Sequence, residues 1–266
     1  MVFVSSSSNK WVKYVKKLSR RRFRDREGKF ILEGVRAVEE GLKAAEVIEI
    51  IMVSPRVIAS ARGQRLIGDA EKAGIMTVEV ADNVMADLSD TETPQGVLAV
   101  ARRRDEVLAE ILDSSPSLLV LVDGVQDPGN LGTIVRTAAG AGAQGLILLP
   151  GTVDLYNPKT LRSSMGNIFQ LSIIDKGERG EILHTLENAG LTFVTGDPGA
   201  QKPVYGVDLT VPVVIVVGSE AHGVQSDILA LTGYRVTIPM AKGVESLNVA
   251  VAAGIMLYEV IRQRHN

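Results

Sequence analysis

One segment of the chain places an amide and a guanidinium at the start of a predicted helix. The run Asp127-Pro-Gly-Asn130 has proline and glycine where a type II turn takes them, so it would deliver Asn130 to the mouth of a helix expected over 131–141. Open α/β sheets bind ligands at this position, just beyond the carboxyl end of a strand. Arg136 follows on the helix face opposite the apolar stripe, where a guanidinium can bind a phosphate through two hydrogen bonds. A surface salt bridge is the alternative for Arg136.

A glycine-rich loop follows a second apolar strand. The strand expected at Val213–Val217 continues into Gly218-Ser-Glu-Ala-His-Gly223, which carries a carboxylate at Glu220. Glycines let a backbone approach a ligand closely, and the N–H and C=O groups of such a loop can read the edge of an adenine or a ribose. The alternatives are that Glu220 caps the next helix and that His222 is a solvent-facing residue rather than a general base.

The third segment lies near the end of the chain. A strand-like run stops at Pro239, a loop crosses Lys242 and Gly243, and Ser246-Leu-Asn248 then opens a helix of small apolar residues. Serine and asparagine cap free backbone N–H groups at a helix start, and the small residues that follow let another backbone come close. A tight loop against a thin helix suits a pocket for a small ligand, with an ordinary βα connection as the alternative.

Charge separates the beginning of the chain from the rest. The 266 residues carry a net charge of −2, but residues 1–36 hold eleven lysines and arginines against three acids, which gives +8 there and −10 elsewhere. A basic block on an otherwise acidic chain is typical of polyanion binding. Trp11, Tyr14 and Phe23 lie within the block, where their rings either stack on unpaired bases or anchor a basic helix to the core.

Several classes of protein are disfavoured by what the sequence lacks. There is no cysteine, and His184, His222 and His265 stand far apart, so disulfides, thiolate chemistry and a metal site are not expected. No apolar run reaches membrane-spanning length, and the first residues lack the pattern of a signal peptide, so we expect no membrane contact and a cytoplasmic location. The glycines of 140–145 have the spacing of a dinucleotide fingerprint but follow a helix and precede a strand, the reverse of the order that the fingerprint needs.

Two α/β domains are expected. Before about residue 102, short strands alternate with helices such as 35–45, which indicates a compact α/β unit. The charged run 102–106 and the hinge 113–117 break this pattern, so we assign an RNA-binding domain to 1–105 and a second domain to 116–266. Near-continuous apolar strands in the second domain predict a parallel sheet buried on both faces. These strands are expected at 118–122, 146–149, 171–174, 191–194, 213–217 and 234–238.

The three segments together resemble the signature motifs of the SpoU/TrmH family of RNA ribose 2′-O-methyltransferases, in the SPOUT superfamily. The matching segments are Asn130–Arg136, Gly218–Gly223 and Ile238–Val249, which occur in the family's order and each beside a strand end. The N-terminal part, from Lys29–Arg36 through Thr93–Val97, is similar to the ribosomal-protein-like RNA-binding domain that precedes the catalytic domain in many members.

The resemblance implies an α/β SPOUT domain that binds S-adenosylmethionine in a deep trefoil knot of the C-terminal loops, although connections between elements normally do not thread. It places three residues against the cofactor, largely through backbone groups: Gly218, Ile238 and Leu247. It assigns five residues to catalytic or active-site positions: Asn130, Arg136, Glu220, Ser246 and Asn248. Members of the family work as homodimers, with an arginine of the partner completing each active site. The loop Arg162–Gly166 also resembles the family's motif at the edge of that site.

The expected reaction is methyl transfer from S-adenosylmethionine to a ribose 2′-hydroxyl of RNA. The additional basic domain favours ribosomal RNA, and the alternatives are transfer RNA, a resistance-conferring modification of one ribosomal nucleotide, and a non-catalytic RNA-binding protein. The family mechanism makes Arg136 the general base, but a guanidinium with a pKa above about 12 stays protonated. We therefore expect Arg136 to clamp the adjacent phosphate and stabilise developing negative charge, with that phosphate or a water accepting the proton.

Overall fold

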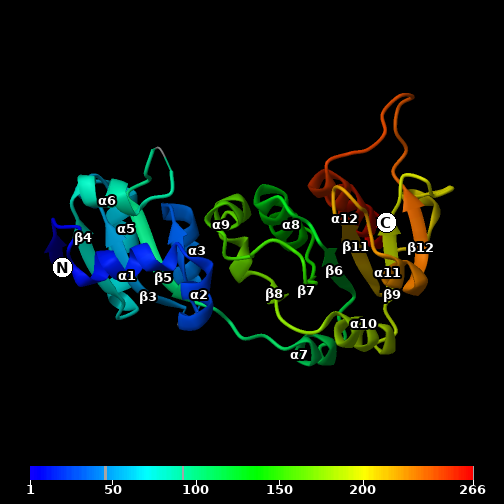
Figure 1. Cartoon of the computed structure of the whole chain (residues 1–266), viewed down its shortest axis with the longest axis horizontal. Helices are drawn as coiled ribbons and strands as arrows, with labels where there is room; N and C mark the ends of the chain where they lie inside the picture. Colours follow the sequence, from blue (N-terminus) through cyan, green and yellow to red (C-terminus); the bar gives the residue numbers. More distant parts are fainter. Residues whose placement is uncertain (45–46, 92, 266) are drawn as a thin grey trace. The chain divides into compact units, whose positions relative to one another are not determined.

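Two compact units make up the chain in a computed structural model that describes residues 1–44, 47–91 and 93–265 (Figure 1). Unit 1 is Met1–Asp105 together with Tyr156–Phe169, and unit 2 is Glu106–Leu155 together with Gln170–Asn266. The expected domain 116–266 therefore contains one stretch that packs with the first unit. Among the residues that the structure describes, every helix is too short or too polar to cross a membrane.

Unit 1 is built on a five-stranded mixed sheet, counted over its described residues, with the order β1-β4-β3-β5-β2. Strands β1, β4 and β3 run parallel, while β5 pairs antiparallel with β3 and β2. The strands are β1 (Val2–Val4), β2 (Lys29–Glu33), β3 (Ile48–Val53), β4 (Met76–Val80) and β5 (Val97–Arg102). The helices are α1 (Lys10–Leu18), α2 (Arg21–Glu27), α3 (Val35–Lys43), α4 (Pro55–Ile58), α5 (Ala61–Lys72), α6 (Asp82–Leu88) and, from the inserted stretch, α9 (Pro158–Ser164). The predicted helix over 35–45 thus ends at Lys43, and Ala45 lies outside the described residues.

The basic helix α1 is amphipathic, and its apolar side is part of the core. Val12, Val15 and Leu18 recur at helical spacing and are buried against strands β3, β4 and β5. The neighbouring Tyr14 and Phe23 pack on the same core, with ring centroids 5.8 Å apart. These two rings and that of Trp11 therefore anchor the basic helices to the core. Anchoring was one of the two roles that the sequence left open, the other being stacking on bases.

The inserted stretch belongs to unit 1 because its aromatic and charged side chains find partners there. The ring of Tyr156 lies 4.7 Å from that of Phe30, and both residues are buried. The Arg162 guanidinium lies 3.6 Å from the Glu33 carboxylate and 3.4 Å from that of Asp90. The position of Arg162 at an active-site edge stays a prediction.

Unit 2 is a seven-stranded sheet, counted over its described residues, in which every strand pair is parallel and the order is β10-β12-β9-β11-β6-β7-β8. Its strands are β6 (Leu118–Asp123), β7 (Gly145–Leu148), β8 (Ser172–Ile174), β9 (Thr192–Gly196), β10 (Lys202–Pro203), β11 (Val213–Gly218) and β12 (Thr232–Thr237). Its helices are α7 (Leu108–Asp113), α8 (Pro128–Gly140), α10 (Arg179–Asn188), α11 (Ser226–Leu231) and α12 (Val249–Arg264). The predicted parallel sheet is confirmed, and the central strands β6 and β11 are buried along nearly their whole length because helices cover both faces.

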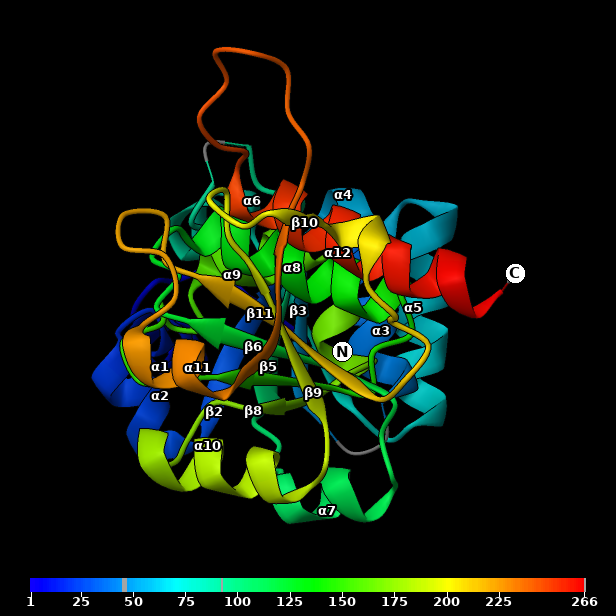
Figure 2. The same cartoon turned by 90° about the vertical axis from the view of Figure 1, so that its right-hand side faces the viewer.

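The two faces of the unit 2 sheet carry different helices (Figure 2). Alternate residues of the strands, including Leu119, Leu121 and Val216, form one core with side chains of α7, α10 and α11. Helices α8 and α12 pack together on the other face, where α12 also contacts β11. The sheet order reverses between β6 and β11, because the chain builds β7 and β8 on one side and then crosses to β9 on the other. Such a switch point is where open α/β sheets bind ligands.

Candidate active site

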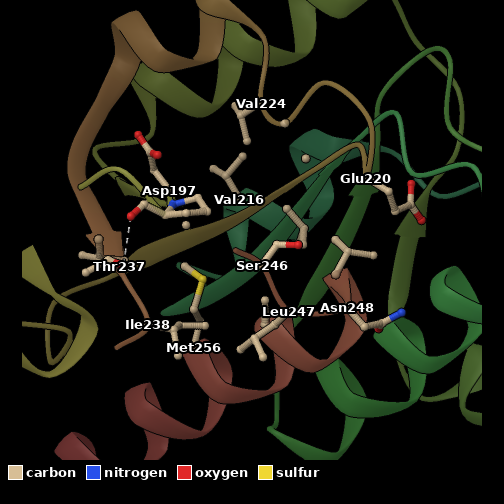
Figure 3. A pocket seen from close by; sticks show the side chains of 18 of the residues that line it. Asp197, Val216, Glu220, Val224, Thr237, Ile238, Ser246, Leu247, Asn248 and Met256 are labelled. Atoms are coloured by element: carbon tan, nitrogen blue, oxygen red, sulfur yellow. Dashed lines mark hydrogen bonds between the residues drawn. The ribbon is translucent and has the colours of Figure 1, made fainter. Parts of the chain in front are cut away.

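A pocket of about 580 Å³ opens at the carboxyl ends of β9, β11 and β12 (Figure 3). Its walls come from three loops and the start of α12. The residues that line it are Gly196, Asp197, Pro198, Val216, Val217, Gly218, Ser219, Glu220, Gly223, Val224, Val236, Thr237, Ile238, Met240, Ser246, Leu247, Asn248, Val249, Ala252 and Met256. All three residues expected against a cofactor, and three of the five expected active-site residues, are among them.

The loop after β11 is folded back on itself and requires a glycine at the last residue of that strand. Ser219 and Gly223 exchange backbone hydrogen bonds of 3.0 and 2.9 Å, and Gly223 takes a left-handed φ of +67° that favours glycine. A Cβ placed on Gly218 would stand 2.3 Å from the carbonyl carbon of Gly223 and 2.5 Å from its oxygen. The sequence therefore builds a narrow loop whose backbone forms one wall of the pocket.

The third motif segment supplies the opposite wall and the start of α12. Asn248 is the N-cap of this helix, because its side-chain oxygen accepts hydrogen bonds from the N–H groups of Ala250 (3.0 Å) and Val251 (3.3 Å). Ser246 and Leu247 precede the cap and lie among the pocket side chains in Figure 3. The loop that leads from β12 to this point stands out from unit 2 in Figure 1.

Three polar side chains from the three motif segments are connected in one chain of hydrogen bonds. The amide nitrogen of Asn248 donates to the side-chain oxygen of Asn130 at 2.9 Å, and the amide nitrogen of Asn130 donates to Glu220 at 2.8 Å. The other oxygen of Glu220 accepts the backbone N–H of Gln126 at 3.3 Å. Each amide thus has its donor and acceptor ends oriented by a neighbour, so the arrangement presents a fixed set of polar groups beside the pocket.

The protonation state of Glu220 follows from these contacts. Partial burial raises the pKa of its carboxyl, while the hydrogen bonds from Asn130 and from backbone N–H groups lower it, and the hydrogen bonds outweigh the burial. The pKa therefore lies below the usual 4.5, and Glu220 is a carboxylate at neutral pH. It acts here as a hydrogen-bond acceptor and not as an acid.

The helix α8 begins earlier than predicted, and the type II turn at 127–130 is wrong. Pro128 and Gly129 are its first residues, and the side chain of Asp127 caps it by accepting the N–H of Asn130 at 2.9 Å. Proline fits the first helical position because a backbone N–H at that position has no partner within the helix, so its absence costs no hydrogen bond. Asn130 is therefore held within the first helical turn. Arg136 lies on the exposed side of the same helix, outside the set of residues that line the pocket.

The sequence motifs do not include some of the pocket residues. Asp197 follows β9, where its carboxylate accepts the Gly199 N–H at 2.8 Å and pairs with Arg235, and the Arg235 hydrogen bond is the main reason that its pKa lies below the usual value. Met256 reaches the pocket from the second turn of α12. An available signal was the position of Asp197 directly after a buried strand, which is the same signal that identified Glu220.

Unit 2 is thus an α/β domain with a pocket at the carboxyl ends of β9, β11 and β12, on one side of the switch point between β6 and β11. The sequence profile of the SpoU rRNA Methylase family matches residues 117–258, and that of the MRM3-like substrate binding domain matches residues 9–99. The chain belongs to the SpoU rRNA methylase family, which confirms the resemblance predicted from the three motifs.

Relatives of this family resemble the chain over nearly its full length. The 23S rRNA (guanosine(2553)-2′-O)-methyltransferase RlmP of Bacillus subtilis is 32% identical over 257 residues, which cover 97% of this chain and 98% of the relative. The crystal structure of the AdoMet-bound rRNA methyltransferase from Sinorhizobium meliloti has a TM-score of 0.85 at 30% identity, covering 98% and 97% of the two chains. That of the SpoU methyltransferase AviRb from Streptomyces viridochromogenes, in complex with AdoMet, has a TM-score of 0.85 at 29% identity, covering 97% and 99%.

Proposed function

We propose that the protein transfers a methyl group from S-adenosylmethionine to a ribose 2′-hydroxyl of ribosomal RNA. The observation that carries the proposal is the pocket at the strand ends, beside which Glu220, Asn130 and Asn248 are joined by hydrogen bonds. The relatives named above support the reaction and the substrate, because one is a 23S rRNA 2′-O-methyltransferase, another is an rRNA methyltransferase, and the two solved structures contain AdoMet.

The pocket fits S-adenosylmethionine in size and charge. Its volume of about 580 Å³ is in the range of small-molecule sites. The carboxylates of Asp197 and Glu220 line it, and the lining residues of the described chain include no lysine or arginine, which suits a ligand that carries a sulfonium cation. When bound, S-adenosylmethionine supplies an electrophilic methyl group. We assign its binding to backbone groups at Gly218, Ile238 and Leu247.

The remaining task of the protein is to orient the ribose hydroxyl and stabilise the charge that develops on it. We assign this to Asn130, Glu220, Ser246 and Asn248, whose polar groups lie beside the pocket, because orientation alone contributes up to about 7–11 kcal/mol to a reaction of this kind. Arg136 would bind the phosphate next to the target ribose through its two-pronged guanidinium, and that phosphate or a water accepts the proton. Replacement of Arg136 by lysine keeps the charge but loses the fork, so an Arg136→Lys enzyme with nearly full activity would refute the clamp.

Unit 1 provides a surface suited to RNA. Most basic side chains on and beside helices α1 and α2 are exposed, although some of them pair with acidic residues such as Asp25 and Asp87. The exposed basic residues are Lys10, Lys13, Lys16, Lys17, Arg20, Arg21, Arg22 and Arg26. Because the aromatic rings of this region are packed into the core, we propose that it binds the phosphate backbone and contributes little base stacking.

We also propose a homodimer in the cytoplasm whose C-terminal loops form a trefoil knot. Val251, Ile255 and Tyr258 form an exposed apolar stripe along α12, and Tyr258 alone is 54% exposed. Such a stripe on a helix, next to the exposed face of α8, is suited to pairing with a second copy. In that dimer, the partner's Arg136 would complete each active site. The convergence of the Gly218 loop, the Ile238 loop and α12 around one pocket supports the knot.

Calorimetry and a transfer assay test this proposal. We expect the purified protein to bind S-adenosylmethionine and to move labelled methyl groups into ribosomal RNA or ribosomal particles, and not into transfer RNA. Labelling of transfer RNA instead of ribosomal RNA would show that transfer RNA is the substrate. Donor binding without transfer to any of these RNAs would refute the proposed substrate class. A protein that binds RNA but no donor would be the non-catalytic alternative.

A further inference from the structure

A buried carboxylate lies at the start of the loop after β6 and at the end of the loop after β11. Asp123 is the last residue of β6, and its side chain is 0% exposed. The register of the sheet places it beside Gly218, the last residue of β11. One oxygen of Asp123 accepts the backbone N–H of Gln225 at 2.9 Å. Asp123 thus starts the loop that leads to Asn130 and also holds the far end of the loop that carries Glu220.

Arg179 is the partner that neutralises this carboxylate. It is the first residue of α10, is 19% exposed, and donates to Asp123 at 2.6 and 3.4 Å. The same guanidinium donates to both oxygens of Asp227 in the first turn of α11, at 2.6 and 2.7 Å. Three separate elements, β6, α10 and α11, are therefore joined through one side chain.

The loop between β11 and α11 is fixed at both of its ends. At its start, Gly218 continues a strand that is paired with β6. At its end, Gln225 is bound by Asp123, and the following helix α11 is held through Asp227 by Arg179. Only six residues lie between the two fixed ends, Gly218 and Gln225, and Glu220 is among them. A shift at Gln225 would therefore move Glu220 relative to Asn130, which it contacts at 2.8 Å.

Stability alone is a weak explanation for this arrangement. Removing two charges from water costs about as much as their attraction returns, so a buried pair usually gives little net stability compared with apolar side chains of similar size. What a buried pair does supply is geometry, because a charge that loses its hydrogen bonds in the interior is strongly disfavoured. The Asp123–Arg179 pair thus permits few positions of the two loops.

We propose that Asp123 and Arg179 are positioning residues for methyl transfer, which set the place of the Glu220 carboxylate by holding the end of its loop. The proposal rests on the function proposed above. Neither residue lines the pocket, so each acts through the loop and not by contact with a substrate. Replacing either should change the rate of transfer through Glu220 and loosen the loop itself.

A double-mutant cycle with Asp123→Asn and Glu220→Gln tests the proposal. We expect Asp123→Asn to lower kcat at least about tenfold in the wild-type background and less than about twofold in the Glu220→Gln background, since residues that act through a common group are not additive. The matched control is Glu259→Gln, which removes the charge of a different carboxylate that is bonded to an arginine; the Glu259 side chain is 12% exposed and lies toward the C-terminal end of α12. This control should leave kcat unchanged. Equal effects of Asp123→Asn in both backgrounds would overturn the proposal.

Amide hydrogen exchange provides a readout that needs no activity. Asp123→Asn should reduce the protection of the Ser219 and Gly223 N–H groups, whose mutual hydrogen bonds close the loop, while the core strand β6 stays protected. If Asp123→Asn does not fold, Arg179→Lys keeps the charge without the fork and should give the same pattern. Unchanged protection of Ser219 and Gly223 in a folded variant would contradict the proposal. A wild-type protein that transfers no methyl group to any RNA would instead refute the proposed function, and the exchange experiment would still decide whether the pair positions the loop.

Discussion

Replacement of Gly218 by alanine probes the shape of the pocket wall most sharply. The added Cβ would stand 2.3 Å from the carbonyl carbon of Gly223 and 2.5 Å from the Val224 nitrogen, and both are backbone atoms. Ordinary contacts of a Cβ begin at 3.4 Å, so the folded-back loop would have to move by about 1 Å. Such overpacking typically costs about 1–3 kcal/mol of folding free energy.

The functional effect of this change should exceed its effect on stability. The displaced loop both lines the pocket and carries Glu220, and a misplacement of about 1 Å can lower a reaction rate about 100-fold. We therefore expect Gly218→Ala to remain folded, to bind S-adenosylmethionine at least about tenfold more weakly in calorimetry, and to lose about two orders of magnitude in transfer rate.

Gly180→Ala serves as the matched control in the same unit. A Cβ at Gly180, in the first turn of α10, meets no atom within 4 Å, so this variant should be as stable as the wild type or slightly more stable, with unchanged donor affinity. A Gly218→Ala protein that binds the donor as tightly as the Gly180→Ala protein would refute the assignment of the Gly218 loop as a wall of the donor site.

Three further changes test other parts of the structure. Because the Glu220 pKa is lowered in the folded protein, its carboxylate stabilises the fold above the usual pKa of 4.5 and loses this contribution as the pH falls through the folded pKa. The free energy of unfolding of the wild type should therefore exceed that of Glu220→Gln at pH 7, and the two values should converge in acid. A difference that stays constant with pH would contradict the assignment. Tyr258→Asp should convert the proposed dimer to monomers in analytical ultracentrifugation without lowering the unfolding midpoint of the monomer. If the molecular mass of the variant equals that of the wild type, α12 is not part of the dimer interface. A further variant reverses the charge of four basic residues on and beside α1 and α2: Lys16, Lys17, Arg20 and Arg21. It should bind RNA more weakly and with a smaller dependence on salt, while its affinity for the methyl donor stays unchanged. An equal loss of donor affinity would show that the two units are not independent.

Periodicity and strand-end position predicted much of unit 2 because they follow from local rules. The continuous apolar runs gave the parallel sheet, and residues placed after strand ends, such as Glu220, lie at the pocket. The start of α8 differs from the prediction because a proline-glycine pair fits both a turn and a first helical turn, and the side chain of Asp127 decides between them. That choice depends on a cap that spacing alone does not reveal.

Other features depend on contacts between distant parts of the chain. The stretch 156–169, which contains helix α9, packs with unit 1 because Tyr156 meets Phe30, some 126 residues earlier in the sequence. The ion pair of Arg179 with Asp123 joins residues 56 apart, and nothing in the local pattern around Arg179 distinguishes it from other arginines at helix ends. The roles proposed for Ile238 and Leu247 come from the family resemblance, because apolar side chains alone would not suggest them.

The reaction proposed for this protein leaves a 2′-O-methylated ribose in ribosomal RNA. The most direct measurement is to incubate the wild-type protein with isotope-labelled S-adenosylmethionine and unmodified ribosomal RNA or particles, digest the product to nucleosides and identify the labelled one by mass spectrometry. We predict a single 2′-O-methylnucleoside, at one position where the backbone resists alkaline cleavage, and its loss in an Asn130→Ala variant. A label found on a base instead of a ribose, or undiminished labelling by Asn130→Ala, would contradict the assignment of this site.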